Sequence, residues 1–280
     1  CTITATQPGD ATYSAATAVS HVVAAGTPAQ TITFPAPASP AAYLSSFSVA
    51  PTATSGLTVG VSVSGVCSRS GNSVTMTSGT GNCTITATQP GDATYSAATA
   101  VSHVVAASKL AQTITVSALP PSAVATSVFT LSATGGGSGN PVTFATQTPG
   151  TCTTAGTNGS TLTLVSAGTC TVQATQSTSP DYADATPVSF SLTVLSAAQA
   201  TSQLRAAVQA SGVQTKVRTG LLVTLDATLD ALARGQTVAA CGQLDAYMGL
   251  VRAQRGKAIP TVTADAWLVE ATASRRALGC

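Results

Sequence analysis

The sequence predicts a mostly β protein in which tandem β-sandwiches are followed by a small α-helical bundle. Two observations predict the sandwiches: apolar and hydroxyl-bearing residues alternate in short runs, and one long segment of the chain recurs. A third predicts the bundle, because apolar residues recur at helical spacing after about residue 196. Charge changes at the same point: six charged residues precede it and fourteen follow it.

The recurring segment is CTITATQPGDATYSAATAVSHVVAA, which occupies residues 1–25 and again residues 83–107. Two shorter segments return at similar intervals. They are AQTIT at 29–33 and 111–115, and CTITATQ at 83 with the looser CTVQATQ at 170. The repeat unit is therefore about 80 to 85 residues long.

This repeat predicts four regions in the chain. They are residues 1–28, the C-terminal part of a truncated repeat with a linker; 29–107, a complete sandwich; 108–196, a second sandwich with a linker; and 197–280, a helical module. Because residues 1–25 match only the last third of a unit, we expect the chain to be a C-terminal fragment of a larger protein.

Within each unit the pattern is that of strands with one buried face. In the run from Cys83 to Thr88, small or apolar residues alternate with threonines, and Val59, Val61 and Val63 continue the same period. Gly-Asn at 71–72 and Asn-Gly at 158–159 are typical of hairpin turns. We expect about seven short strands in each unit and no helix, which is the pattern of a β-sandwich.

The seven cysteines are predicted to form three disulfides and to leave Cys1 unpaired. The predicted pairs are Cys67 with Cys83, Cys152 with Cys170, and Cys241 with Cys280. Cys67 follows the inward phase of Val63 and Cys83 leads that of Ile85, so both should face the core. Buried free thiols are the alternative. Disulfides would indicate an oxidising compartment, hence an extracellular or cell-surface location.

The last region shows the helical period. Leu222, Leu225, Leu229 and Leu232 fall on one helix face, as do Val238, Cys241, Leu244, Met248 and Val251. Helix ends are predicted at four glycines, Gly212, Gly235, Gly256 and Gly279. Four amphipathic helices of this length would pack as a small bundle.

Two parts of the chain resemble known bacterial modules. CTITATQPGDATYSAA, with GVCSRSGNSVTMTSGTGN before it and AQTITF at the domain start, resembles the immunoglobulin-like (Big/MBG-type) tandem repeats of secreted and cell-surface proteins. The resemblance covers residues 1 to about 195 and implies an immunoglobulin-like fold that serves as a spacer or adhesive stalk. The tail, LLVTLDATLDALARGQTVAACGQLDAYMGLVRAQRGKAI, resembles the FIMAH-like helical module of secreted multidomain proteins, which implies no catalytic residues.

No catalytic, cofactor-binding or metal-binding residues are predicted. His21 and His103 occupy the same position in two different repeats, so they cannot converge on one site, and Asp92 and Asp181 are typical turn caps. GGGSGN at 135–140 lacks the Lys-Ser or Lys-Thr and the helix of a phosphate-binding loop. We therefore expect no enzyme activity and no cofactor.

Charge limits the class of partner. Only 7% of the residues are charged and the net charge is +2. Because nucleic-acid binding needs clustered basic residues, we expect no nucleic-acid partner. No apolar run is long enough to span a membrane. The tail carries nine basic and five acidic residues, and its candidate partner-binding residues are Arg252, Arg255, Arg275 and Arg276. A solvated face is the alternative interpretation of these charges.

The expected function is a non-catalytic extracellular stalk or adhesion region of a large bacterial secreted or cell-surface protein. Its partner would be a cell-wall or extracellular polysaccharide or another surface protein. Two alternatives stay open. One is the accessory C-terminal region of a secreted hydrolase whose catalytic domain lies upstream. The other is a carbohydrate-binding region, which would need exposed aromatic residues in a row, and the chain's aromatics are few and scattered.

Overall fold

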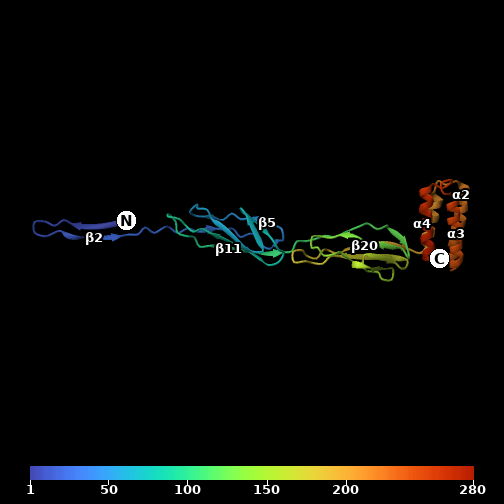
Figure 1. The fold of residues 1–280 in the computed structure, drawn as a ribbon, viewed down its shortest axis with the longest axis horizontal. Helices are drawn as coiled ribbons and strands as arrows, with labels where there is room; N and C mark the ends of the chain where they lie inside the picture. Colours follow the sequence, from blue (N-terminus) through green and yellow to red (C-terminus); the bar gives the residue numbers. More distant parts are fainter. The chain divides into compact units, whose positions relative to one another are not determined.

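The computed structural model describes residues 1–280, which divide into two compact units, Cys1–Leu110 and Ala111–Cys280 (Figure 1). The first unit contains a two-stranded hairpin, β1 (Thr2–Gln7) and β2 (Ala16–Val22), and a β-sandwich. The second contains another sandwich and four helices. The predicted fold class, immunoglobulin-like β-sandwiches followed by a helical bundle, is confirmed.

The first sandwich has two facing sheets and a short strand pair. Its strands are β3 (Ile32–Thr33), β4 (Ala41–Ala42), β5 (Ser46–Ser48), β6 (Thr52–Ala53), β7 (Gly60–Gly65), β8 (Cys67–Ser70), β9 (Ser73–Met76), β10 (Asn82–Thr88) and β11 (Val101–Ser108). One sheet has the order β4-β11-β10-β7, the other β5-β9-β8, and β3 pairs with β6. There are nine strand segments rather than seven, because three of them are two-residue pieces.

The second sandwich repeats this topology strand for strand. Its elements are β12 (Thr115–Val116), β13 (Ser122–Val124), β14 (Val128–Thr130), β15 (Ala133–Thr134), β16 (Thr143–Thr146), β17 (Cys152–Ala155), the 3₁₀ turn η1 (Thr157–Gly159), β18 (Thr161–Leu164), β19 (Gly168–Thr175) and β20 (Val188–Leu195). The sheets are β13-β20-β19-β16 and β14-β18-β17, with β12 paired to β15. The expectation that the units contain no helix misses η1, whose Asn158 adopts a left-handed conformation.

Alternation in the sequence produces the core in both sandwiches. Along β10, Cys83, Ile85 and Ala87 are fully buried while the threonines between them are only partly buried. Strand β19 has the same pattern, with Cys170, Val172 and Ala174 inward. Since successive side chains of a strand point to opposite faces, each strand contributes one row to the core and one to the surface.

The tail forms four helices with a shared core. They are α1 (Ala197–Ala210), α2 (Thr215–Ala233), α3 (Thr237–Gln254) and α4 (Thr261–Ala277). Each ends two residues before one of the four predicted glycines. Ser196 and Gln199 form a capping box that starts α1, and Trp267 lies in the core of the bundle. None of the helices combines the length and apolar character needed to cross a bilayer.

Candidate functional site: stapled sandwiches and the basic end of the bundle

Three disulfides are present, between the cysteines that the sequence pairs: Cys67–Cys83, Cys152–Cys170 and Cys241–Cys280. Cys1 is free and exposed. The first two bonds are equivalent, because each joins a strand of one sheet (β8 or β17) to a strand of the facing sheet (β10 or β19). The route to Cys67 differs from the expected one. It does not extend the strand of Val63, because the chain crosses at Gly65 and Val66 into the other sheet.

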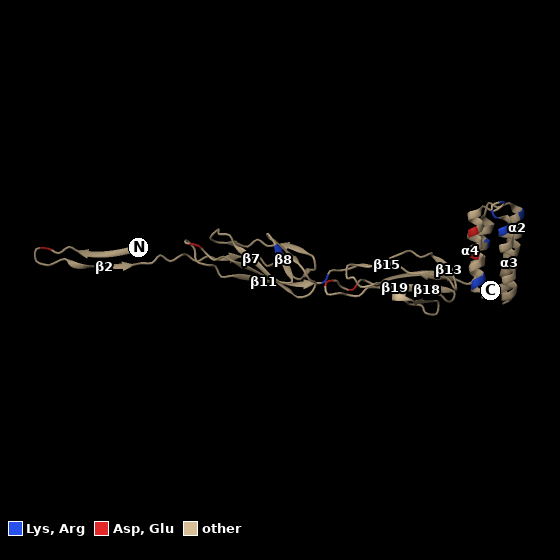
Figure 2. Ribbon diagram, in the orientation of Figure 1, with Lys and Arg blue, Asp and Glu red and all other residues tan.

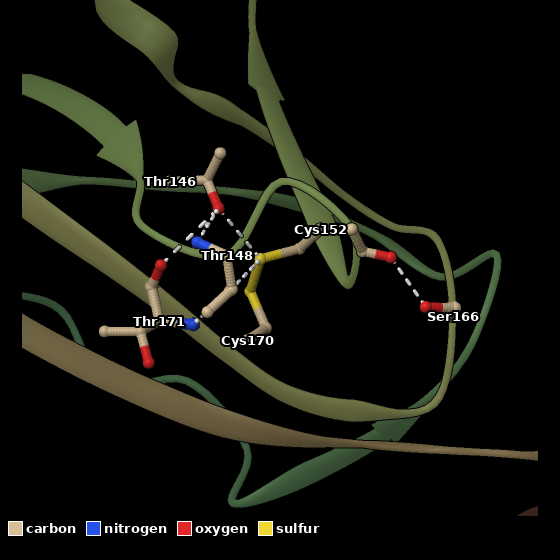
Figure 3. The surroundings of a disulfide bond; sticks show 7 residues. Thr146, Thr148, Cys152, Ser166, Cys170 and Thr171 are labelled. Atoms are coloured by element: carbon tan, nitrogen blue, oxygen red, sulfur yellow. Dashed lines mark hydrogen bonds between the residues drawn. A yellow bond between two sulfur atoms is a disulfide. The ribbon is translucent and has the colours of Figure 1, made fainter.

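Figure 3 shows the surroundings of the second disulfide. Cys152 and Cys170 are both fully buried. The hydroxyl oxygens of Thr146 and Thr148 lie 3.3 and 3.5 Å from the sulfur of Cys152, and the Thr148 hydroxyl accepts a 2.9 Å hydrogen bond from the amide of Thr171. The disulfide is therefore held inside a hydrogen-bonded corner of the sandwich.

Sequence reasoning missed a second device, a pair of buried glutamines in each sandwich. Gln30 and Gln89 are about 5% exposed, and the side-chain amide of Gln30 donates to the side-chain oxygen of Gln89 at 3.0 Å and to the carbonyl of Ser96 at 2.8 Å. Gln89 in turn donates to the carbonyl of Thr58 at 3.3 Å. These bonds tie the segment just before β3, the segment before β7 and the loop between β10 and β11 to one another.

The second sandwich uses Gln112 and Gln176 at the equivalent positions. Gln112 donates to the carbonyls of Ser177 and Ala183, and Gln176 donates to that of Asn140 at 2.8 Å. The glycine run at 135–137 packs directly on this pair, since a Cβ at Gly136 would lie 2.3 Å from the Cβ of Gln112. The run is thus a close-packed structural segment. The recurrence of these glutamines in AQTIT and ATQ is the sequence signal that could have revealed them. Their pairing could not be read from it, because Gln30 and Gln89 are 59 residues apart and only the fold brings them into contact.

His103 and the turn residue Asp92 have structural partners. His103 lies opposite Ile85 across the β10–β11 pair, and its Nε2 is 2.8 Å from the carbonyl oxygen of Phe34. Asp92 accepts hydrogen bonds from the amides of Thr94 and Tyr95 at 2.7 and 2.8 Å, as a turn cap does. No group of three or more His, Cys, Asp or Glu side chains is placed to hold a metal ion.

The four candidate arginines lie in two separate places. α3 and α4 are antiparallel, and Arg255 pairs with Asp265 while Arg275 pairs with Asp245. The two ion pairs are separated by ten residues along each helix, which is about 15 Å at a rise of 1.5 Å per residue. Arg252 lies beside Arg255, and Arg276 beside Arg275. The structure thus brings the arginines together in pairs and not as one cluster.

The ion pairs differ in geometry. Two nitrogens of Arg255 donate to the two oxygens of Asp265 at 2.6 and 2.7 Å, and this partner lowers the pKa of the Asp265 carboxyl and raises that of Arg255. Arg275 Nε lies 3.2 Å from Asp245 Oδ1 but lacks hydrogen-bond geometry. Nearby, burial raises the pKa of Glu270, and burial together with the charge of Glu270 raises that of Tyr247.

One end of the bundle gathers more basic side chains than the sequence singled out. The α1–α2 and α3–α4 turns share this end, which we call the basic end, as expected for an antiparallel four-helix arrangement. The basic residues at or next to these turns are Lys216, Arg218, Arg252, Arg255 and Lys257. In Figure 2 the basic residues appear as blue ribbon around the turns at this end, and a separate blue segment lies near the C-terminus. Asp265 is the acidic partner among them.

A hollow of about 670 Å³ opens between the same two turns. Its lining includes Lys257, Thr261 and Ser211, which supply a cation and hydroxyls, and it borders Trp267, which is 4% exposed and part of the bundle core. Arg252, Lys216 and Lys257 are exposed. Lys216 and Arg218 escaped the sequence analysis because only the helix connectivity places them beside Arg252 and Lys257.

No protein-family model and no curated protein matches the chain. Three solved structures are similar to parts of it: a C-terminal 282-residue fragment of intimin in complex with the intimin-binding domain of the translocated intimin receptor, domains EC1–4 of Drosophila N-cadherin, and the Bacteroides ovatus protein SGBP-B of a mixed-linkage glucan utilization locus in complex with a mixed-linkage heptasaccharide. Their identities are 20%, 11% and 13%, and their TM-scores 0.26, 0.22 and 0.20. They cover 59%, 59% and 60% of this chain. The chain covers 51%, 51% and 48% of them, about half their length, and similarities this low carry no function over to it.

Proposed function

We propose that the chain is a non-catalytic extracellular stalk or adhesion region of a bacterial secreted or cell-surface protein, in which tandem sandwiches act as spacers and the helical bundle attaches to an acidic polysaccharide. One observation carries the stalk: the two sandwiches share strand order, disulfide position and buried glutamine pair, so one structural unit is used twice. Three disulfides favour an oxidising compartment.

The surface chemistry of the sandwiches supports a spacer. Across the strand pairs, hydroxyls bond to one another, as between Thr86 and Ser102 at 2.8 Å and between Thr143 and Thr175 at 2.9 Å. Such neutral pairs stay hydrated without charge, and cross-strand pairs of this kind stabilise a sheet modestly. A domain of this type depends on its core and its disulfide for stability outside the cell, and we propose that it catalyses no reaction.

The basic end supplies the attachment. Of its five basic side chains, Arg255 is paired with the carboxylate of Asp265, and the hollow beside them is large enough for a sugar residue. Exposed charges of one sign on a small module attract a polyanion over a distance set by the ionic strength, about 10 Å at 0.1 M salt. An acidic polysaccharide presents regularly spaced carboxylates to match them.

We expect the full chain to bind polygalacturonate and to ignore neutral dextran. Replacing Arg252 and Lys257 together by glutamine should weaken binding about 10-fold, which corresponds to roughly 0.7 kcal/mol for each exposed charge. Binding should also disappear at 1 M salt, where screening acts within about 3 Å. Affinity electrophoresis or biolayer interferometry would measure both effects.

The matched control removes two exposed arginines from the other end of the bundle. Arg234→Gln with Arg276→Gln lowers the net charge equally and should change binding less than about 2-fold. Equal losses in the two variants would show that net charge alone, and not the basic end, holds the polymer. Hydrolysis of the polysaccharide that disappears on Asp245→Asn or Glu270→Gln would overturn the non-catalytic assignment.

A further inference from the structure

The first sandwich has a hollow beside its one arginine. The hollow measures about 480 Å³ and is bordered by residues 50–53, by residues 56–59 that lead into β7, and by Arg69 of β8 and Asn72 of the turn after it. Most of these bordering side chains are small or apolar. Figure 2 shows the blue segment at β8. A single cation thus lies at the rim of a largely apolar hollow.

This cation is held in place and has no carboxylate partner. Within residues 29–107 only Arg69 and Asp92 are charged, and the three ion pairs of the chain all lie in the helical bundle. Nη1 of Arg69 donates to the carbonyl of Gly71 at 2.6 Å, which fixes the guanidinium over its own turn. Because a guanidinium has five N–H donors, the others can bind an anion at the hollow.

The wall of the hollow offers apolar surface next to two sheet edges. The side chains of Leu57, Val59 and Val61 are only partly buried. β7 pairs with β10 alone and β8 with β9 alone, so each strand lies at the edge of its sheet. An edge strand presents unpaired backbone N–H and C=O groups that can pair with an added strand. The place therefore has the features of a peptide-binding edge.

The second sandwich fills the equivalent place with its own chain. Phe144 corresponds to Val61, since each lies opposite the equivalent alanine of the neighbouring strand. The turn after β17 consists of residues 156–160, whereas the turn after β8 consists only of residues 71–72. The longer turn folds back so closely that a Cβ on Gly159 would lie 2.0 Å from the carbonyl oxygen of Phe144, whose side chain is buried. Polypeptide is thus what this fold accepts here.

We propose that the hollow of the first sandwich binds the C-terminal end of an extended polypeptide whose last residue is apolar. The terminal carboxylate pairs with Arg69, the last side chain enters the hollow against Val59 and Val61, and the preceding backbone pairs with the free edge of β7. A terminal residue fits because it carries a carboxylate and an apolar side chain on one carbon. An acidic side chain would bring the charge without the apolar group, and the lining has no aromatic ring on which a sugar could stack.

The test titrates the full chain, with Cys1→Ala, against the peptide acetyl-Gly-Ser-Thr-Val-Thr-Leu while amide resonances are followed by NMR. The resonances of β7 and of Arg69 should shift, and amide exchange in β7 should slow. Amidation of the peptide's C-terminus should weaken binding about 10-fold, because a charge-assisted hydrogen-bonded pair is lost. A second amidated peptide, with aspartate in place of valine, keeps the negative charge on a side chain and should bind as weakly as the first amide.

Three variants of the protein locate the site. Arg69→Gln changes an exposed side chain, so the sandwich should stay folded while binding weakens about 10-fold. Thr154→Arg places the same charge at the equivalent position of the second sandwich, where it should create no second site because residues 156–160 cover the place. Arg252→Gln with Lys257→Gln should leave peptide binding unchanged, which separates this site from the proposed polysaccharide site of the bundle.

Three results would overturn the proposal. The first is no shift of the β7 resonances at about 1 mM peptide, the weakest affinity that a specific site of this kind should have. The second is equal binding of the acid and the amide, or binding that survives Arg69→Gln. The third is self-association of the peptide-free chain through β7, because the occupant of the edge would then be a second copy.

Discussion

Replacing Cys152 and Cys170 together by alanine is expected to lower the free energy of unfolding of the second sandwich by about 3 kcal/mol. The bond closes a loop with a sequence separation of 18, and about 3 kcal/mol is the chain-entropy estimate for a loop of this size. Both side chains are fully buried, so the substitution also removes packed sulfur from the core and deprives the Thr146 and Thr148 hydroxyls of a neighbour. For a domain of this size the melting temperature should fall by about 15 °C.

Calorimetry of the full chain, with amide exchange in β19 to identify the transition, would measure the change. Cys1→Ala is the matched control, because it removes an exposed free thiol and should shift no transition. The equivalent double substitution at Cys67 and Cys83 should affect the first sandwich to a similar degree. If the double substitution at Cys152 and Cys170 moved the transition by less than about 3 °C, the disulfide would not be a principal source of stability.

Replacing Gln89 by alanine is expected to destabilise the first sandwich by about 3 kcal/mol, because buried hydrogen-bond partners left unsatisfied cost about 1–3 kcal/mol each. The side chain accepts from Gln30 at 3.0 Å and from the amide of Gly91, and it donates to the carbonyl of Thr58. Amide exchange of β10 in the native state should accelerate by about 100-fold, the equivalent of that free energy.

The chain contains its own control for this substitution. Gln7 occupies the same sequence, ATQPGD, but is exposed and keeps only the local bond that it accepts from the amide of Gly9 at 2.9 Å. Gln7→Ala should leave the exchange rates of both sandwiches unchanged. An equal effect of the two substitutions would mean that glutamine acts through its own turn and not through the buried network.

The fold was predictable from sequence wherever one residue pattern was sufficient to specify it. Alternation from Cys83 to Thr88 identified the inward face, and the presence of two cysteines in each complete repeat identified their partners. The glutamine pairs were not predictable, since Gln30 and Gln89 look like ordinary loop residues until the fold brings strands 59 residues apart together. A buried amide is acceptable there because nearly all of its hydrogen bonds are made inside the corner.

The candidate site was predictable only in part, for a related reason. The sequence showed that the tail is basic, and it grouped Arg275 with Arg252 because both belong to the tail. In the structure the two arginines lie in different places along the helices. Helix connectivity decides which charges share an end, and it groups Arg252 with Lys216 of another helix.

The central claim, that the chain is a stalk of disulfide-stapled spacer domains, is tested most directly by stretching the full chain, with Cys1→Ala, between its ends in a force spectrometer. Each sandwich should unfold in one discrete step. On reduction the two steps should lengthen by about 55 and 60 Å, since 16 and 18 residues are released at up to about 3.4 Å each. Gradual extension without discrete steps, or step lengths that reduction leaves unchanged, would contradict the account.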